Sequence, residues 1–119
     1  MILLFVYGTL KRGGRNHRQL SGQTFVATGR TVPGYRLFDL GDFPGMVSFP
    51  SAPEGVEGEV WSIADAAFLR LDDFEGVAQG LYRREPVALL PPFAGQTVHA
   101  YLYPHGVEGR RDLGSIWNG

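Results

Sequence analysis

The chain has 119 residues, with 11 lysines and arginines against 12 aspartates and glutamates, and no cysteine. We expect one domain, residues 1–119, whose net charge of -1 gives no general attraction to nucleic acid or to an anionic membrane. The lack of cysteine excludes disulfides, thiolate catalysis and thiolate metal sites. The 17 glycines and eight prolines favour many short strands joined by turns over a helical bundle.

An apolar run over residues 1–6 opens the chain, and Gly8 is the first residue after it that bends freely. This pattern predicts a buried strand. Backbone N–H groups that follow such a strand have no ladder partner and can hold a carboxylate or an oxyanion; the alternative is an ordinary strand-to-loop turn. The run is too short for a membrane span, and no basic region precedes it as in a secretory signal, so we expect a cytoplasmic protein.

A basic segment over residues 11–16 is expected to be a flexible loop, followed by a short helix over residues 17–20 with Asn16 as its cap. Gly29 is a candidate β-bulge within the strand that comes next. Strands are predicted over residues 23–32, 35–39, 46–49 and 56–63, the last of them packed on both sides at one end.

The clearest predicted helix covers residues 66–75, with Ser62 as its cap and an acid three residues later, and Gly76 is placed to end it. Strands over residues 81–90 and 97–103 follow, and residues 104–119 are expected to be irregular. Pro86 indicates an edge strand or a bulge. About six strands and one helix describe an α+β domain whose mixed sheet curls into a small barrel.

Glu75 shares one face of this predicted helix with Phe68 and Leu71, while Asp73 points away. A carboxylate on an apolar face is costly unless it is neutral, paired or functional. Burial, the helix macrodipole and the nearby Asp72 are each expected to raise the pKa of Glu75, which suits a general base that later acts as an acid. The alternative is a frayed last turn in which Glu75 is simply solvated.

Other patterns are weaker. Gly8 and Gly13 have the spacing of a phosphate-binding loop, but Gly14 and Arg15 stand where Lys and then Ser or Thr are required. A barrel that binds single-stranded nucleic acid through residues 11–18 is a further alternative, against which the net charge argues. The three histidines have no metal-ligand spacing, so no metal is expected: His17, His99 and His105.

Five segments stand in a specific order and spacing: VYGTLKRG (6–13), NHR (16–18), VEGEV (56–60), LDDFE (71–75) and LYRR (81–84). Together they resemble the gamma-glutamylcyclotransferase-like family, particularly its gamma-glutamylamine cyclotransferase branch. The resemblance runs from residue 2 to about residue 103. It implies a small β-barrel with flanking helices, in agreement with the predicted sheet.

The resemblance also implies an activity. The α-amine of a γ-glutamyl amide attacks its own γ-carbonyl, which closes a five-membered ring and releases 5-oxoproline and a free amine, with no metal or cofactor. Glu75 is implied as the catalytic glutamate. The implied substrate-binding loop consists of Tyr7, Gly8, Thr9 and Leu10, and Tyr82 and Tyr103 are further candidates for hydrogen bonds in the pocket.

A second reading is a non-catalytic module of the same fold that binds γ-glutamyl or other small anionic ligands. The sequence leaves the identity of the leaving amine open among a lysine side chain, a small amine and a γ-glutamyl-protected metabolite. Residues 41–45 and 77–80 would set this specificity, and their conformations do not follow from the sequence. We expect a small-molecule substrate, no nucleic acid or membrane partner, and a monomer or weak dimer.

Overall fold

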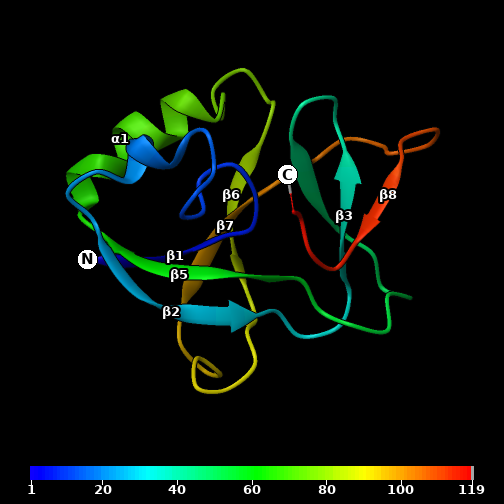
Figure 1. Cartoon of the computed structure of the whole chain (residues 1–119), viewed down its shortest axis with the longest axis horizontal. Coiled ribbons are helices and arrows are strands. Elements are labelled where there is room, and N and C mark those ends of the chain that lie inside the picture. Colours follow the sequence, from blue (N-terminus) through cyan, green and yellow to red (C-terminus); the bar gives the residue numbers. More distant parts are fainter. Residues whose placement is uncertain (119) are drawn as a thin grey trace.

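In the computed structural model, which describes residues 1–118, a mixed eight-stranded sheet carries one α-helix against one of its faces (Figure 1). The strands are β1 (Ile2–Val6), β2 (Thr24–Arg30), β3 (Tyr35–Asp39), β4 (Pro44–Ser48), β5 (Glu57–Ile63), β6 (Arg83–Val87), β7 (Val98–Leu102) and β8 (Asp112–Gly114). The helices are the short 3₁₀ helix η1 (His17–Leu20) and α1 (Asp65–Phe74). No helix of this described part has the length and apolar character needed to cross a membrane.

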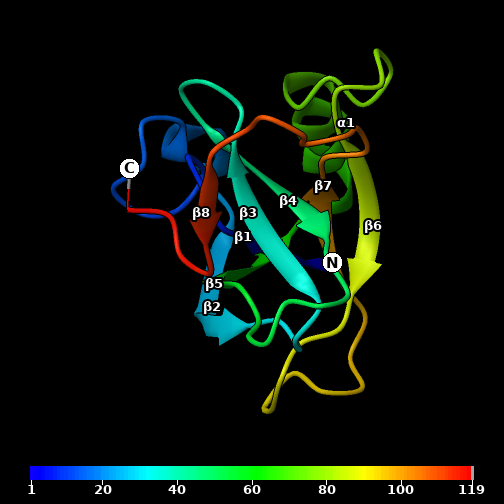
Figure 2. The ribbon, with the colours of Figure 1, turned by 90° about the vertical axis from the view of Figure 1, so that its right-hand side faces the viewer.

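The sheet branches at β7. Its order is β2-β5-β1-β7-β4-β3-β8, and β6 pairs with β7 outside that path. Both β1 and β4 run parallel to β7, with β1 pairing at Val98 and His99 and β4 at Leu102. Along β7, β1 pairs near the start of the strand and β4 pairs near its end. We call the place beside β7 where β1 and β4 separate the fork. The strands change direction progressively, so the sheet curls into a half-barrel, as Figures 1 and 2 show together, and the predicted α+β class is confirmed.

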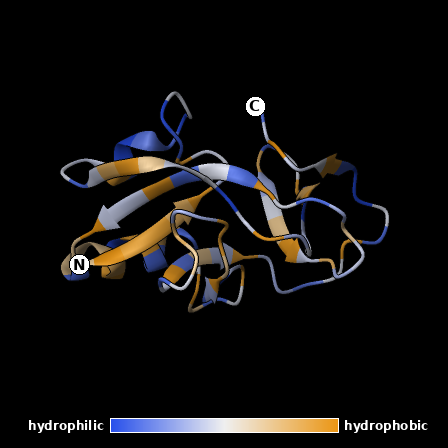
Figure 3. Cartoon of the chain, turned by 90° about the horizontal axis from the view of Figure 1, so that it is seen from below, coloured by the Kyte–Doolittle hydropathy of each residue, from blue (hydrophilic) through white to orange (hydrophobic). Residues whose placement is uncertain are grey.

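Strand β1 is buried on both of its faces. Because alternate residues of a strand point to opposite sides, Leu4 and Val6 pack in the cluster beneath α1, whereas Phe5 and Tyr7 pack in the cluster on the other side of the sheet. A strand covered on both faces has no polar side, which explains its uninterrupted apolar sequence. In Figure 3 this strand, which starts at the N-terminus, is orange along its length.

Helix α1 occurs where it is predicted, one residue earlier at each end. It buries Phe68 and Leu71 as the periodicity indicates, while Asp73 is exposed. Gly76 follows with a φ of 69°, a left-handed conformation that favours glycine, so its predicted role in ending the helix is confirmed.

Neither predicted side chain caps its helix, because Ser62 belongs to a strand and the side chain of Asn16 is paired elsewhere. Ser62 lies inside β5, and the N–H of Ala64 at the start of α1 donates instead to Gln23 Oε1, at 2.8 Å. Asn16 stands at the N-cap position of η1 as predicted, but its side chain makes no capping hydrogen bond. Its side-chain Nδ2 donates to Thr9 Oγ1 at 3.0 Å, which ties the basic loop to the turn after β1.

The bulge in β2 is also misplaced by the prediction. It lies between Phe25 and Ala27, while Gly29 keeps its register opposite Gly58. Pro86, by contrast, lies in β6, which pairs only with β7 among the described strands, so the predicted edge position is confirmed.

Residues 104–119, expected to be irregular, contain the short strand β8, which pairs antiparallel with β3 and raises the strand number above the expected one. Three residues are too few to show a periodicity. A residue far away in the sequence holds β8 in place: Arg36 Nε on β3 donates to the Asp112 carboxylate at 2.8 and 2.9 Å. Residue 119, the last of both this range and the expected domain, lies outside the described residues.

Candidate active site

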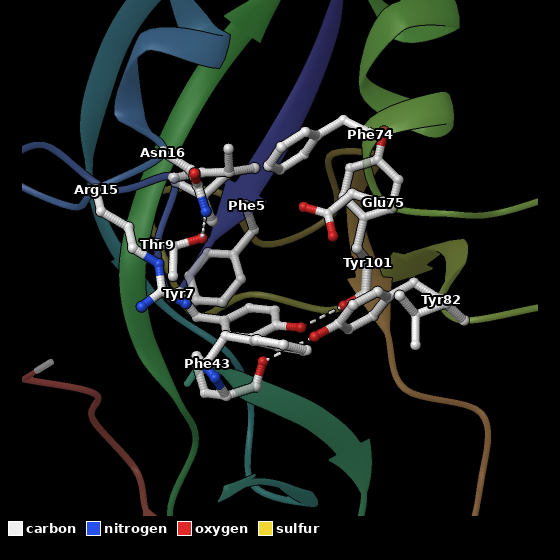
Figure 4. A pocket seen from close by; sticks show the side chains of 15 residues that line it. Phe5, Tyr7, Thr9, Arg15, Asn16, Phe43, Phe74, Glu75, Tyr82 and Tyr101 are labelled. Atoms are coloured by element: carbon white, nitrogen blue, oxygen red, sulfur yellow. Dashed lines mark hydrogen bonds between the residues drawn. The ribbon is translucent and has the colours of Figure 1, made fainter. Parts of the chain in front are cut away.

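A cavity of about 340 Å³ lies at the carboxyl end of β1, at the fork between β1 and β4. A volume of this size suits a small molecule. Its lining residues are Phe5, Val6, Tyr7, Gly8, Thr9, Leu10, Arg15, Asn16, Phe43, Pro44, Phe74, Glu75, Leu81, Tyr82 and Tyr101 (Figure 4). All the site residues expected from the sequence are therefore in one place, except Tyr103.

The turn over residues 8–10 forms one wall. Gly8 is required where this turn meets β4, since a Cβ atom there would lie 2.7 Å from Cγ of Pro44. The three carbonyls of the turn are occupied: the N–H of Lys11 donates to Gly8 O at 3.1 Å, that of Asn16 donates to Thr9 O at 3.0 Å, and His17 Nδ1 lies 2.9 Å from Leu10 O. Within residues 1–118, the three backbone N–H groups of the turn donate to no other group. Their hydrogen-bonding capacity is unused there, and the anion-binding role expected from the sequence stays a prediction.

Tyr7 closes the fork in the sheet. Its buried hydroxyl donates to the carbonyl oxygen of Tyr101 in β7 at 2.5 Å and accepts the N–H of Met46 in β4 at 3.2 Å. Burial raises the pKa of Tyr7 well above its ordinary value, so the hydroxyl remains a donor. The backbone thus uses this hydroxyl both as a donor and as an acceptor, and Tyr7 also lines the cavity.

Glu75 lies at the end of α1, and its carboxylate points into the cavity toward the wall that carries Thr9 and Asn16 (Figure 4). Its N–H donates to Leu71 O at 2.9 Å, so the last turn is formed rather than frayed. No hydrogen bond or ion pair reaches the carboxylate from elsewhere in residues 1–118. Burial without a partner raises the pKa of Glu75 to about 7, which confirms the predicted direction.

The expected contribution of Asp72 to this pKa is wrong. Its carboxylate is held by Arg84, through Nε at 2.9 Å and Nη2 at 3.2 Å, and by the hydroxyl of Tyr101 at 2.7 Å. Burial alone would raise the pKa of Asp72, but these hydrogen bonds and the guanidinium charge outweigh it and lower the pKa. The adjacent positive charge offsets that of Asp72, so burial is what raises the pKa of Glu75.

Two further tyrosines were expected in the pocket. The hydroxyl of Tyr82 donates to Pro44 O at 2.9 Å, and burial raises the pKa of Tyr82. Tyr82 lines the cavity, whereas Tyr103 does not. The Tyr103 ring packs edge-on against Tyr82, with 6.1 Å between ring centroids, and so supports the cavity wall from outside.

The basic loop is less free than expected. The backbone N–H and Nε of Arg12 donate to the Glu59 carboxylate at 3.0 and 3.1 Å. Lys11 Nζ donates to Trp117 O at 2.8 Å, and Arg15 Nη2 donates to Asp42 O at 2.6 Å. Three of the cations that suggested nucleic-acid binding are thus engaged within the chain.

Several lining residues were missed from sequence. Asn16 belongs to one of the segments that carry the family resemblance, a signal that was interpreted as a helix cap, and Phe43 lies in the predicted specificity segment 41–45. Arg15 and Tyr101 have no such signal, since their positions depend on how the loops and strands assemble. No group of three or more His, Cys, Asp or Glu side chains suited to a metal ion occurs in residues 1–118.

A half-barrel whose cavity sets one unpartnered glutamate across from free backbone amides has the framework of a small-molecule enzyme that works by proton transfer. The chain belongs to the family described as gamma-glutamyl cyclotransferase, AIG2-like, whose sequence model matches residues 4–118. The family resemblance found in the sequence is therefore confirmed.

Relatives and solved structures agree with this assignment. The chain is 34% identical over 112 residues to a Vibrio cholerae protein named provisionally as a gamma-glutamylcyclotransferase, covering 94% of this chain and 92% of that protein. It is 42% identical over 91 residues to the human gamma-glutamylaminecyclotransferase, covering 71% of this chain but only 59% of the human protein.

Among solved structures, a uropathogenic E. coli-specific protein superposes with a TM-score of 0.83 at 29% identity, over 98% of this chain and 91% of that one. An AIG2-like protein from Mus musculus gives 0.70 at 30% identity, over 89% and 78% of the two chains. The names of the relatives support a cyclotransferase, and none of these matches favours the non-catalytic module.

Proposed function

We propose that this protein is a cyclotransferase of γ-glutamyl amines in which Glu75 transfers the protons. The observation that carries the proposal is the position of the Glu75 carboxylate, which has a pKa near 7 and shares one small cavity with the free amides of residues 8–10. A γ-glutamyl amide carries an α-carboxylate and an α-amine on one carbon. The cavity offers a donor set for the first group and a base for the second.

The reaction needs little beyond correct positioning, because nucleophile and electrophile belong to the same molecule. The substrate's α-nitrogen attacks its γ-carbonyl carbon, a C–N bond forms within a five-membered ring, and the C–N bond to the amine breaks. The protein must hold the glutamyl chain in a folded conformation. The buried walls around Phe5 and Tyr82 favour this conformation because they exclude water.

The protons balance through one carboxylate. Of the three protons on the α-ammonium, one stays on the ring nitrogen and two end on the released amine, which leaves as an ammonium ion. A carboxylate with a pKa near 7 is suited both to accept protons from the attacking nitrogen and to donate them to the departing one. Backbone amides of residues 8–10 supply hydrogen bonds to the α-carboxylate or to the oxyanion.

The test is 5-oxoproline release from a panel of γ-glutamyl amines, measured by chromatography for the purified protein and for Glu75→Gln. We expect the variant to lose at least about 100-fold in kcat, since it can neither accept nor deliver a proton. Asp73→Asn is the matched control, because Asp73 is exposed on the same helix and does not line the cavity.

Two outcomes would contradict the proposal. Full activity of Glu75→Gln would remove Glu75 from the mechanism. Binding of γ-glutamyl amines by calorimetry without turnover of any would favour the non-catalytic module. The cytoplasmic location, the single domain over residues 1–119 and the monomeric or weakly dimeric state remain predictions from the sequence.

A further inference from the structure

The cavity changes in character from its floor to its rim. Its deep wall is made of nearly inaccessible residues, such as Phe5, Val6 and Tyr101, each at most 3% exposed. At the rim, Phe74 is 40% exposed and Leu81 is 42% exposed, although both line the same cavity. The rim thus presents two large apolar side chains to solvent.

The fold holds these two side chains at the same rim. Phe74 is the last residue of α1, and the chain then turns at Gly76, whose carbonyl accepts the N–H of Leu81 at 3.0 Å. A Cβ atom at Gly76 would lie 3.1 Å from Cβ of Leu81, so the returning chain packs closely against the end of the helix. Exposed apolar surface bordering a pocket is typical of a site that a ligand covers.

The charges at the cavity are sparse. Among the residues that line the cavity, Glu75 is the only acidic one and Arg15 is the only cationic one. Asp72, one turn before Glu75 on α1, is already paired with Arg84 and Tyr101. Among the residues that line the cavity, a cationic group on the leaving amine would therefore find no carboxylate other than Glu75, which is engaged with the reacting nitrogens, and it would share the cavity with the guanidinium of Arg15.

We propose that the amine released by this protein is apolar beyond its reacting nitrogen, an alkyl or aryl amine rather than one bearing a second cation. The inference rests on the proposed function. The glutamyl part of the substrate occupies the buried floor, where the free amides and Glu75 lie, and the amine substituent extends over Phe74 and Leu81. Phe74 and Leu81 are the specificity-determining residues.

Three substrates test this inference: γ-glutamyl-isoamylamide, γ-glutamyl-leucine and Nε-(γ-glutamyl)-lysine, compared by kcat/KM for 5-oxoproline release. We expect the isoamylamide to exceed the lysine compound by about 10-fold or more. γ-Glutamyl-leucine carries a carboxylate beside its apolar side chain, so it tests whether the rim recognises an apolar group alone. Turnover of the isoamylamide above that of the leucine compound supports the inference. Preference for the leucine compound that Arg15→Gln abolishes would assign a carboxylate-bearing amine and would overturn it.

Variants at the rim make the assignment specific. Phe74→Ala and Leu81→Ala are each expected to lower kcat/KM for the isoamylamide about 10-fold, chiefly through KM, with a change below about 2-fold for the lysine compound. Phe74→Leu should restore most of the loss. Leu69→Ala is the control, because Leu69 is 79% exposed on the same helix and lies outside the cavity.

The experiment separates failure of the apolar-amine inference from failure of the cyclotransferase proposal. Equal or better turnover of the lysine compound, or equal losses for all substrates in Phe74→Ala, overturns the inference and leaves the cyclotransferase standing. Absence of 5-oxoproline from every substrate overturns the proposed function, and the inference falls with it.

Discussion

Glu75 owes its chemistry to burial without a partner. A carboxylate that loses water and gains no cation or N–H group is costly to ionise, and this cost appears as a pKa near 7. The same property must reduce the stability of the folded protein once Glu75 is charged. Stability and catalysis are therefore linked through one group.

The stability should depend on pH in a way that Glu75→Gln removes. The folded pKa of about 7 lies above the ordinary 4.5, so the folded state binds more protons between these values and the free energy of unfolding falls as pH rises through them. The expected fall attributable to Glu75 is about 3 kcal/mol. Urea denaturation of both proteins from pH 4 to 8 checks it, and parallel profiles would contradict the assigned pKa.

Tyr7 illustrates a second role for a residue at the site. Its hydroxyl takes the place of strand pairing at the fork, because it satisfies the Tyr101 carbonyl on β7 and the Met46 N–H on β4. Both backbone groups are buried, and each would be costly to leave unpaired. Tyr7 thus lines the cavity while its hydroxyl holds the two strands together.

Tyr7→Phe should therefore cost about 2 kcal/mol of unfolding free energy, although it removes a single oxygen atom. Tyr35→Phe is the matched control. Tyr35 is only half-buried, and its hydroxyl makes no hydrogen bond within residues 1–118, so a change below about 0.5 kcal/mol is expected. Equal effects in urea denaturation would show that the fork does not depend on this hydroxyl.

At the level of elements, α1 is fastened to the sheet close to its catalytic end. Asp72 on the last turns of the helix receives Arg84 from β6 and Tyr101 from β7. The guanidinium of Arg84 also lies over the Phe68 ring, 4.4 Å from its centroid. Because Glu75 lies three residues beyond Asp72, this connection fixes where its carboxylate enters the cavity.

A double-mutant cycle on Asp72→Asn and Arg84→Gln should give a coupling energy of about 1 to 2 kcal/mol, since the pair is bidentate and about three-quarters buried, with side chains 28% and 25% exposed. The neighbouring pair Arg83 and Glu85 is the comparison. It is 3.6 Å apart, with side chains 68% and 44% exposed, and should give less than about 0.5 kcal/mol. The coupling energies are measured by urea denaturation at pH 7. Similar values for the two pairs would contradict the claim that the Asp72–Arg84 pair fastens α1 to the sheet.

The elements also differ in how well the sequence predicts them. Helix α1, with Phe68, Leu71 and Glu75 on one face, follows from its own periodicity, and strand β1 follows from its uninterrupted apolar run. The caps do not, because Gln23 reaches the start of α1 from a distant segment. Local patterns predict elements and faces, whereas hydrogen-bond partners far apart in the chain depend on the completed fold.

For the whole molecule, strand order is the information that the sequence pattern lacks. Gly8 and Glu75 could be recognised as chemically informative from local features, but only the fork between β1 and β4 brings them to one cavity. Tyr101 could not be selected because its value comes from its position on β7 between α1 and Tyr7. The family resemblance supplied the missing long-range relation.

The segment after β7 completes the molecule and reaches back to the site. The Ser115 carbonyl accepts the N–H of Glu57, and the Trp117 carbonyl accepts Lys11 Nζ, next to the turn that lines the cavity. Trp117 is half-buried and packs against the cluster that contains Phe5. The C-terminal segment therefore stabilises both the inner core and the loop of the site.

Trp117→Ala should accordingly lower the unfolding free energy by about 2 kcal/mol, less than for a fully buried tryptophan, because Trp117 is only partly buried. It should also weaken substrate binding, with a rise in KM larger than the fall in kcat. The Trp117 backbone carbonyl that accepts Lys11 Nζ remains in the variant, but the segment that carries it loses the side chain that holds it against the core. Ile116→Ala, at a residue 41% exposed and outside both core clusters, should change stability by less than about 0.5 kcal/mol. Denaturation in urea and 5-oxoproline release kinetics on the two variants measure these effects, and an unchanged KM in Trp117→Ala would separate the C-terminal segment from the binding loop.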